Sequence, residues 1–145
     1  MRAFLTLLLL TIVSTTFAAR LGKCQGWSVA PLTHSVGGKS TFRANDEVTL
    51  KWNVGISQVK YIREVTLSSA KSNQPLHTQL RSYPGIKASN GKITFKLSVP
   101  LCLQREGEYF LNVVASTPGK EGDCLATTPS FRLTPEPNKD YSVCK

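Results

Sequence analysis

The chain has 145 residues, a formal net charge of +9 and four cysteines. This length supplies one domain with a hydrophobic core, so we expect no second domain. The basic residues are scattered and form no run of the kind found in nucleic-acid-binding arms, so we expect no nucleic-acid partner.

The first 18 residues have the organisation of a secretory signal peptide. Arg2 gives an early positive charge, an apolar stretch follows, and small residues at Thr16 and Ala18 suit a signal peptidase. A membrane anchor is the alternative, but the apolar stretch is too short to span about 30 Å of hydrocarbon. We therefore expect residues 1–18 to be a signal peptide, no membrane span, and a secreted mature domain of residues 19–145.

The mature domain remains strongly basic. Loss of Arg2 with the signal peptide leaves 17 Lys and Arg against 9 Asp and Glu, a net charge near +8. Such a surface attracts anionic partners, whether acidic glycans, phosphorylated wall polymers or lipid headgroups. The alternative is that the charge serves solubility alone.

Apolar and polar residues alternate along most of the mature chain, and no stretch has the period of a helix. The clearest strands, 48–54 and 93–99, each have one apolar and one polar face. Residues 58–69 form a strand that Arg63 interrupts, which predicts a bulge or an arginine with its stem along the apolar surface. Further strands are expected at 108–116 and 130–134, with weaker ones near 27–33 and 77–82.

These segments, separated by turn residues, predict an all-β protein. About seven short antiparallel strands with regular turns are typical of an immunoglobulin-like sandwich of two sheets. Within it, Trp52 shares the parity of Leu50 and Val54, which predicts a core position for its side chain.

The four cysteines predict two disulfides, because an even number in a secreted chain is the pattern of an oxidised framework. Their spacing is too wide for a zinc site. If successive strands alternate in direction, Cys24 and Cys124 both precede upward strands and share one end of the sandwich. Cys102 and Cys144 both follow upward strands and share the other end. The favoured pairing is therefore Cys24 with Cys124 and Cys102 with Cys144.

The sequence offers little that supports catalysis, so we expect a non-enzymatic protein without cofactor or metal ion. His34 and His77 are the only histidines, and neither lies in a catalytic or metal-binding motif. The acids are few, and glycosidase acids would have to converge from turns at opposite ends of the sandwich. The loop from Glu121 to Asp123 has too few ligands in sequence to support a calcium site.

Outward lysines on neighbouring strands predict a positively charged sheet face. The candidate residues of this face are Lys51, Lys60, Lys92 and Lys96. An acidic polysaccharide can lie across such a face, with Tyr61 or Tyr83 as a stacking platform.

Five segments resemble the N-terminal Kre/Knh-like domain of fungal cell-wall synthesis proteins, a family that includes Ser/Thr-rich, lipid-anchored surface proteins. They are VTLKW at 48–52, VTL at 65–67, ITFKLSVP at 93–100, GEYF at 107–110 and TPSFRL at 128–133. The resemblance covers about 36–135. It implies an immunoglobulin-like sandwich at the cell surface, associated with wall assembly or β-glucan organisation, with no catalytic residues to carry over.

This chain departs from the family in two ways: it lacks the Ser/Thr-rich stalk with its lipid-anchor tail, and it adds four cysteines. Both departures favour a free extracellular protein. The sequence therefore predicts a binding or structural module associated with the fungal wall or an extracellular polysaccharide. A secreted protein-binding effector or adhesion module is the alternative.

Overall fold

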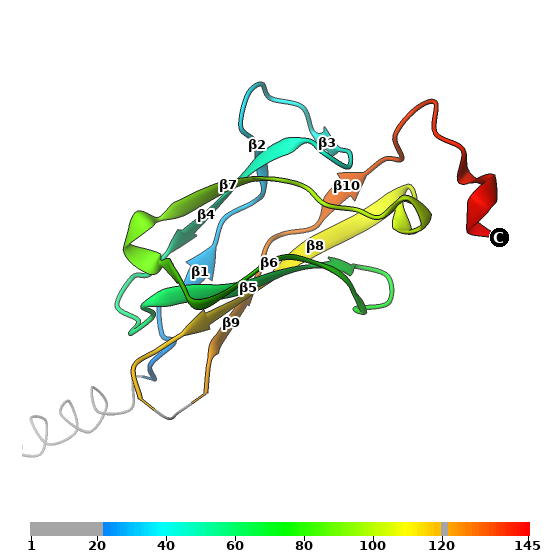
Figure 1. Cartoon of the computed structure of the whole chain (residues 1–145). Helices are drawn as coiled ribbons and strands as arrows, with labels where there is room; N and C mark the ends of the chain where they lie inside the picture. Colours follow the sequence, from blue (N-terminus) through cyan, green and yellow to red (C-terminus); the bar gives the residue numbers. More distant parts are fainter. Residues whose placement is uncertain (1–21, 120–121) are drawn as a thin grey trace, which may run out of the picture.

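The computed structural model describes residues 22–119 and 122–145, so the predicted signal peptide lies outside the described residues. Two β-sheets lie face to face (Figure 1), which confirms the predicted all-β, two-sheet sandwich. The four-stranded sheet contains β1 (Ser28–Val29), β2 (Thr33–His34), β4 (Glu47–Asn53) and β7 (Lys92–Lys96). In this sheet, β1 and β2 both pair with β4, and β7 pairs with β4 as well.

The six-stranded sheet has β8 at its centre. Its members are β3 (Thr41–Phe42), β5 (Tyr61–Ser69), β6 (Pro75–Lys87), β8 (Gly107–Ser116), β9 (Cys124–Thr127) and β10 (Phe131–Leu133). The strand order is β3-β10-β8-β5-β6, with β9 also paired to β8. Three short 3-10 helices complete the described elements: η1 (Ala88–Asn90), η2 (Leu101–Leu103) and η3 (Tyr141–Cys144).

The ten strands correspond to about seven continuous ones. β1, β2 and β3 are pieces of one first strand that crosses between the sheets, and β9 and β10 are pieces of one last strand. One strand pair departs from the antiparallel pattern, since β3 pairs with β10 in parallel. The reason is directional: the first and last strands run the same way, so they can meet only in parallel.

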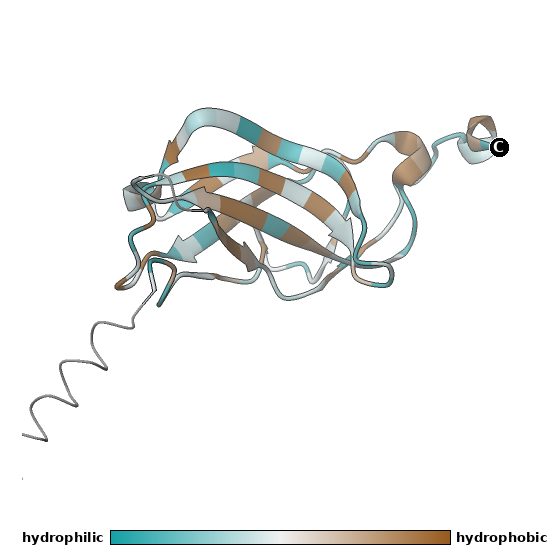
Figure 2. Cartoon of the chain, turned by 90° about the horizontal axis from the view of Figure 1, so that it is seen from below, coloured by the Kyte–Doolittle hydropathy of each residue, from teal (hydrophilic) through white to brown (hydrophobic). Residues whose placement is uncertain are grey.

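Alternation of apolar and polar side chains forms the core between the sheets. Figure 2 shows this as bands of opposite hydropathy along the strands. Val48 and Leu50 of β4 belong to the same cluster of buried residues as Leu111 and Val113 of β8. Trp52 is buried as predicted, and its Nε1 donates a hydrogen bond to the Ala88 carbonyl at 2.7 Å. Full burial of such side chains contributes about 1.5–3 kcal/mol each.

The predicted disulfide pairing is confirmed. Cys24 bonds to Cys124 and Cys102 to Cys144, with Cα separations of 5.5 and 5.2 Å. The first bridge lies at the end of the sandwich where the described chain begins, and the second at the end that carries the C-terminus (Figure 1). Disulfides of this kind are typical of proteins in oxidising compartments. No helix among the described residues is both long and apolar enough to cross a membrane.

The C-terminal segment is also held by one buried side chain, Gln104. Its Nε2 donates to the Val99 carbonyl and to a Glu136 carboxylate oxygen, each at 3.1 Å. Its Oε1 accepts from the Glu136 amide at 3.1 Å and from the Tyr141 hydroxyl at 2.9 Å. The carboxamide therefore uses all of its hydrogen-bonding capacity and links η2 to the final residues. The hydrogen bond from the Gln104 side chain, and to a smaller extent the one from the Asn45 side chain, hold the pKa of Glu136 below its usual range.

Candidate functional site

The outer surface of the four-stranded sheet carries three of the four lysines predicted to form a basic face. Lys51 of β4 lies directly opposite Lys92 of β7, and Lys96 lies farther along β7. All three side chains are exposed, and we call this set the lysine face. Lys60 is not part of it, because its backbone amide bonds to the Ser116 carbonyl in the six-stranded sheet.

In the lysine face, Lys51 and Lys92 lie opposite each other, and neither lies opposite an acidic residue. Within residues 22–119 and 122–145, no ion pair involves Lys51, Lys92 or Lys96, although Lys96 lies opposite Glu47 in the register. Two like charges directly opposite each other on a sheet destabilise the pair, by an amount within about 0.2–1 kcal/mol. The arrangement therefore costs stability and leaves a positive field that an anion can neutralise.

A row of hydroxyl groups crosses the same face. Thr33 of β2, Thr49 of β4 and Thr94 of β7 occupy neighbouring positions in the register. The Thr49 hydroxyl lies 3.0 Å from that of Thr94 and 2.9 Å from that of Ser35. The Thr49 hydroxyl is buried within this row, whereas Thr33 and Thr94 are exposed and their hydroxyls can donate to or accept from a ligand rich in oxygen. The alternation of side chains in the sequence predicts that Thr49 and Thr94 belong to the polar faces of their strands. It does not show that these two residues lie opposite each other in the sheet.

The two tyrosines predicted as a stacking platform for this face lie elsewhere. Tyr61 begins β5 and Tyr83 belongs to β6, and both strands are in the six-stranded sheet. The prediction that they would flank the lysines was wrong, because the chain changes sheets between β4 and β5. Parity within a strand tells which face a residue occupies, but not in which sheet that strand lies.

Tyr61 and Tyr83 instead line one shallow hollow together with Arg63 and Asp123. Its volume is about 470 Å³. The Arg63 guanidinium lies 5.8 Å from the centre of the Tyr83 ring. Arg63 Nη1 also donates to both Asp123 carboxylate oxygens, at 3.1 and 3.2 Å. We call these four residues the tyrosine hollow. The sequence marked Arg63 as irregular but gave no sign that Asp123 would meet it.

A second ion pair flanks the tyrosine hollow. Arg81 Nη2 lies 3.2 Å from Glu64 Oε1, and these two residues are partners in the β5–β6 register. The hydrogen bond from Arg81 is the main reason that the pKa of Glu64 lies below its usual range; it outweighs the desolvation that raises this pKa, and a bond from Thr66 lowers the pKa further. The flank of the hollow is therefore polar but carries no net charge at neutral pH.

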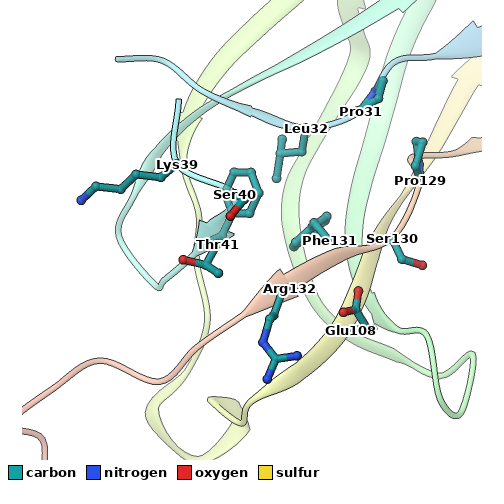
Figure 3. A pocket seen from close by; sticks show the side chains of 11 residues that line it. Pro31, Leu32, Lys39, Ser40, Thr41, Glu108, Pro129, Ser130, Phe131 and Arg132 are labelled. Carbon is teal, nitrogen blue, oxygen red and sulfur yellow. The ribbon is translucent and has the colours of Figure 1, made fainter. Parts of the chain in front are cut away.

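A separate hollow of about 440 Å³ lies between the first strand and β10. Figure 3 shows its lining, in which Leu32 and Phe131 are apolar and Lys39 and Arg132 are directed away from these two side chains. Arg132 is engaged by Glu106, whose hydrogen bond raises the pKa of the guanidinium. The lining is mixed, because Ser40, Thr41, Glu108 and Ser130 lie beside the apolar residues, and the guanidinium of Arg132 already has an acidic partner.

The histidines take part in structural contacts. His34 ends β2, and its ring stacks on Phe42 with centroids 4.3 Å apart while Nε2 lies 2.8 Å from the Thr41 carbonyl. His77 Nε2 lies 3.1 Å from the Ser98 hydroxyl. In the part of the chain that the structure describes, no group of three or more His, Cys, Asp or Glu residues is placed to hold a metal ion.

No protein-family model matches this chain, and no curated protein matches it. The resemblance to the fungal Kre/Knh-like domain therefore stays a prediction. The surfaces described above are what a proposal for its function can use.

Proposed function

We propose that this chain is a secreted, non-catalytic module that binds an anionic polysaccharide of a cell wall through its lysine face. The observation that carries the proposal is the direct opposition of Lys51 and Lys92 without an acidic partner. A protein that keeps a destabilising pair of like charges on an exposed sheet gains most from it when an anion binds there.

The chemistry of the face matches an extended anionic chain. Each lysine ammonium is a compact charge with three donors, which suits uronate carboxylates or phosphates. The hydroxyls of Thr33 and Thr94 are beside the lysines and can bond to sugar oxygens. A polymer carries many such units, so weak single contacts add up through high effective concentration.

We propose that the protein acts outside the cell. The two disulfides are consistent with export, and the resemblance of the sequence to fungal wall proteins makes the fungal cell wall the setting that we favour. Binding is favoured over catalysis because the acids are kept apart: Glu106 adjoins the start of β8, whereas Asp123 adjoins the strand paired with the end of β8.

The test is retention of the oxidised protein on an immobilised polyuronate, with β-glucan, chitin and mannan as neutral matrices. We expect retention on the polyuronate that falls steeply as salt rises, because exposed charges are screened beyond about 10 Å at 0.1 M salt. The combined substitutions Lys51→Glu, Lys92→Glu and Lys96→Glu should weaken binding at least tenfold, a loss of about 1.4 kcal/mol or more.

The matched control makes the same change of charge away from the face. Lys39→Glu, Lys71→Glu and Lys145→Glu together alter three exposed lysines outside the four-stranded sheet. This control should retain most of the binding. Equal losses in the two triple variants would reduce the effect to net charge and overturn the lysine face as the site. No retention on any polymer at low salt would favour the protein-binding alternative.

A further inference from the structure

The tyrosine hollow lies on the six-stranded sheet and is separate from the lysine face. We propose that it is a second binding site, for one or two units of a neutral saccharide. This inference goes beyond the proposed function and does not depend on it. It uses a different sheet, different side chains and a different kind of contact.

The hollow is built by irregularities in two adjacent strands. Between the paired positions Ile62–Ile86 and Glu64–Arg81, β5 has one residue, Arg63, and β6 has four. The predicted bulge at Arg63 is thereby confirmed, and the register on the β8 side shifts at the same point. Bulges at sheet edges redirect side chains, and this one carries Tyr83 outward.

The bulge in β6 depends on Gly85. Its φ of +121° lies in a region that other residues rarely adopt, and a Cβ there would lie 2.5 Å from the Ile62 carbonyl oxygen. The backbones of β5 and β6 therefore approach closely at a position where only glycine fits. This local sequence requirement fixes the position from which Tyr83 projects.

Tyr83 presents an open aromatic surface. The residue is 87% exposed, the highest value among the large apolar residues of the six-stranded sheet that are described as exposed. The Arg63 guanidinium lies over its ring and leaves the rest of the side chain open. An exposed, rigid aromatic ring is suited to stack against the C–H groups on one side of a pyranose.

The Arg63–Asp123 pair supplies oriented donors and acceptors without net charge. The two side chains hold each other through a bifurcated contact from Arg63 Nη1 to both Asp123 oxygens, yet they remain 39% and 38% exposed. The guanidinium has further N–H groups and the carboxylate has further lone pairs. Because every sugar hydroxyl both donates and accepts, neighbouring hydroxyls can bond to both partners. A small ion gains little, because each charge is already neutralised.

The shape of the site favours a saccharide over a protein. The hollow of 470 Å³ adjoins one of 320 Å³ that also contains Arg63, Tyr83 and Asp123. Both values fall within the range of small-ligand sites, about 300–1,000 Å³. A stable protein interface needs about 800 Å² from each partner around apolar anchors. In the described part of this sheet, only Tyr83 and Leu125 are large apolar residues that stay mostly exposed.

The test titrates the full oxidised protein, labelled with nitrogen-15, with neutral tetrasaccharides of glucose, mannose and N-acetylglucosamine. We expect at least one of them to shift the amide resonances of Arg63, Tyr83 and Asp123, with a dissociation constant on the order of 1 mM. The shifts should persist in 0.5 M salt, because the contacts involve no net charge on the ligand.

Single substitutions show whether binding of the saccharide depends on the Tyr83 ring or on any exposed apolar side chain of this sheet. Tyr83→Ala should weaken binding about tenfold or more, whereas Tyr83→Phe should keep it, because the ring remains. Leu125→Ala is the matched control, since it removes an exposed apolar side chain of the same sheet that does not line the hollow. Unchanged binding in Tyr83→Ala would overturn the proposal.

Three other outcomes would also overturn it. One is the absence of shifts with all three tetrasaccharides, and another is binding that 0.5 M salt abolishes. The third is a protein partner whose binding is lost in both Tyr83→Ala and Leu125→Ala, with no response to sugars. The lysine-face triple variant separates the two proposals, because it should lose the polyuronate and keep the tetrasaccharide.

Discussion

Gln104 shows at the scale of one residue why a buried polar side chain can be more important for stability than its size suggests. It is almost fully buried, and all four of its hydrogen bonds go to groups of the protein. Loss of such a side chain leaves several partners without a bond, and each orphaned group carries a desolvation cost.

We therefore expect Gln104→Leu to lower the free energy of unfolding by about 2–3 kcal/mol, because the Glu136 amide and the Val99 carbonyl lose their partner. Urea unfolding followed by tryptophan fluorescence measures the change. Gln74→Leu, at an exposed position, is the matched control and should change stability by less than about 0.5 kcal/mol. Equal effects of the two substitutions would show that the Gln104 network contributes nothing.

Glu64 leads to a prediction about pH. Its pKa is lowered in the folded protein, chiefly by the hydrogen bond from Arg81, so the charged form is favoured by folding. Its contribution to stability is present above the unfolded pKa of about 4.3 and is lost as the pH falls through the lower folded value.

The expected result is a stability difference between the wild type and Glu64→Gln that is constant near neutral pH and disappears in acid. The pair is largely exposed, so the difference should stay below about 1 kcal/mol. Unfolding curves from pH 7 to pH 2 measure it. Arg81→Ala should give the same dependence, and a difference that grows as the pH falls would contradict the sign.

Much at the residue scale could be predicted from the sequence. Period-two alternation identified Trp52 as a core residue and Arg63 as an irregular one, because both conclusions follow from neighbours within a strand. The partners of Gln104 and the meeting of Arg63 with Asp123 could not be predicted. Apart from the bond between Gln104 and Val99, these contacts join residues 32 to 60 positions apart, and nothing local in the sequence encodes them.

At the scale of elements, long strands were predictable and short ones were not. β4, β5 and β8 were located within a few residues, whereas the two-residue β3 carries too little pattern to detect. β6 was expected only at 77–82 but extends from Pro75 to Lys87, because its bulge interrupts the alternation. The lysine face was found because β4 and β7 are adjacent. Lys60 and the two tyrosines were expected beside the other lysines but lie with the six-stranded sheet. Tertiary contacts decide which sheet a strand joins, and the pattern within a strand does not show them.

The pairing of β4 with β7 gives a prediction that links stability to binding. Lys92→Glu turns a like-charge pair across the two strands into an opposite-charge pair with Lys51, so it should raise the free energy of unfolding by about 0.2–1 kcal/mol. The same change should weaken retention on a polyuronate. Lys71→Glu alters the net charge equally in the turn before β6 and should produce neither effect. A loss of both stability and retention in Lys92→Glu would mean that Lys92 has a structural role instead.

The whole molecule is a sandwich with a disulfide at each end and a different chemistry on each outer face. The bridges were predictable from topology, since strand direction alone decides which cysteines share an end. They differ in the length of chain that they close, with sequence separations of 100 for Cys24–Cys124 and 42 for Cys102–Cys144. The loop-entropy model assigns about 4.7 kcal/mol to the longer loop and about 4 kcal/mol to the shorter.

We expect the double substitution of Cys24 and Cys124 by alanine to destabilise the protein more than that of Cys102 and Cys144. The first also removes the fully buried Cys124 side chain, whereas the second frees only the C-terminal segment. Thermal unfolding of the two double variants measures the order, and amide exchange confined to residues 134–145 in the second shows that the release is local. The reverse order of stabilities would contradict this account.

We propose that an anionic polysaccharide binds across β4 and β7. Amide resonances of the nitrogen-15-labelled protein, recorded during titration with a uronate oligosaccharide, test it most directly. We expect shifts concentrated at residues 47–53 and 92–96 that disappear as salt is added. Shifts spread evenly over the basic residues, or concentrated on the six-stranded sheet, would contradict it.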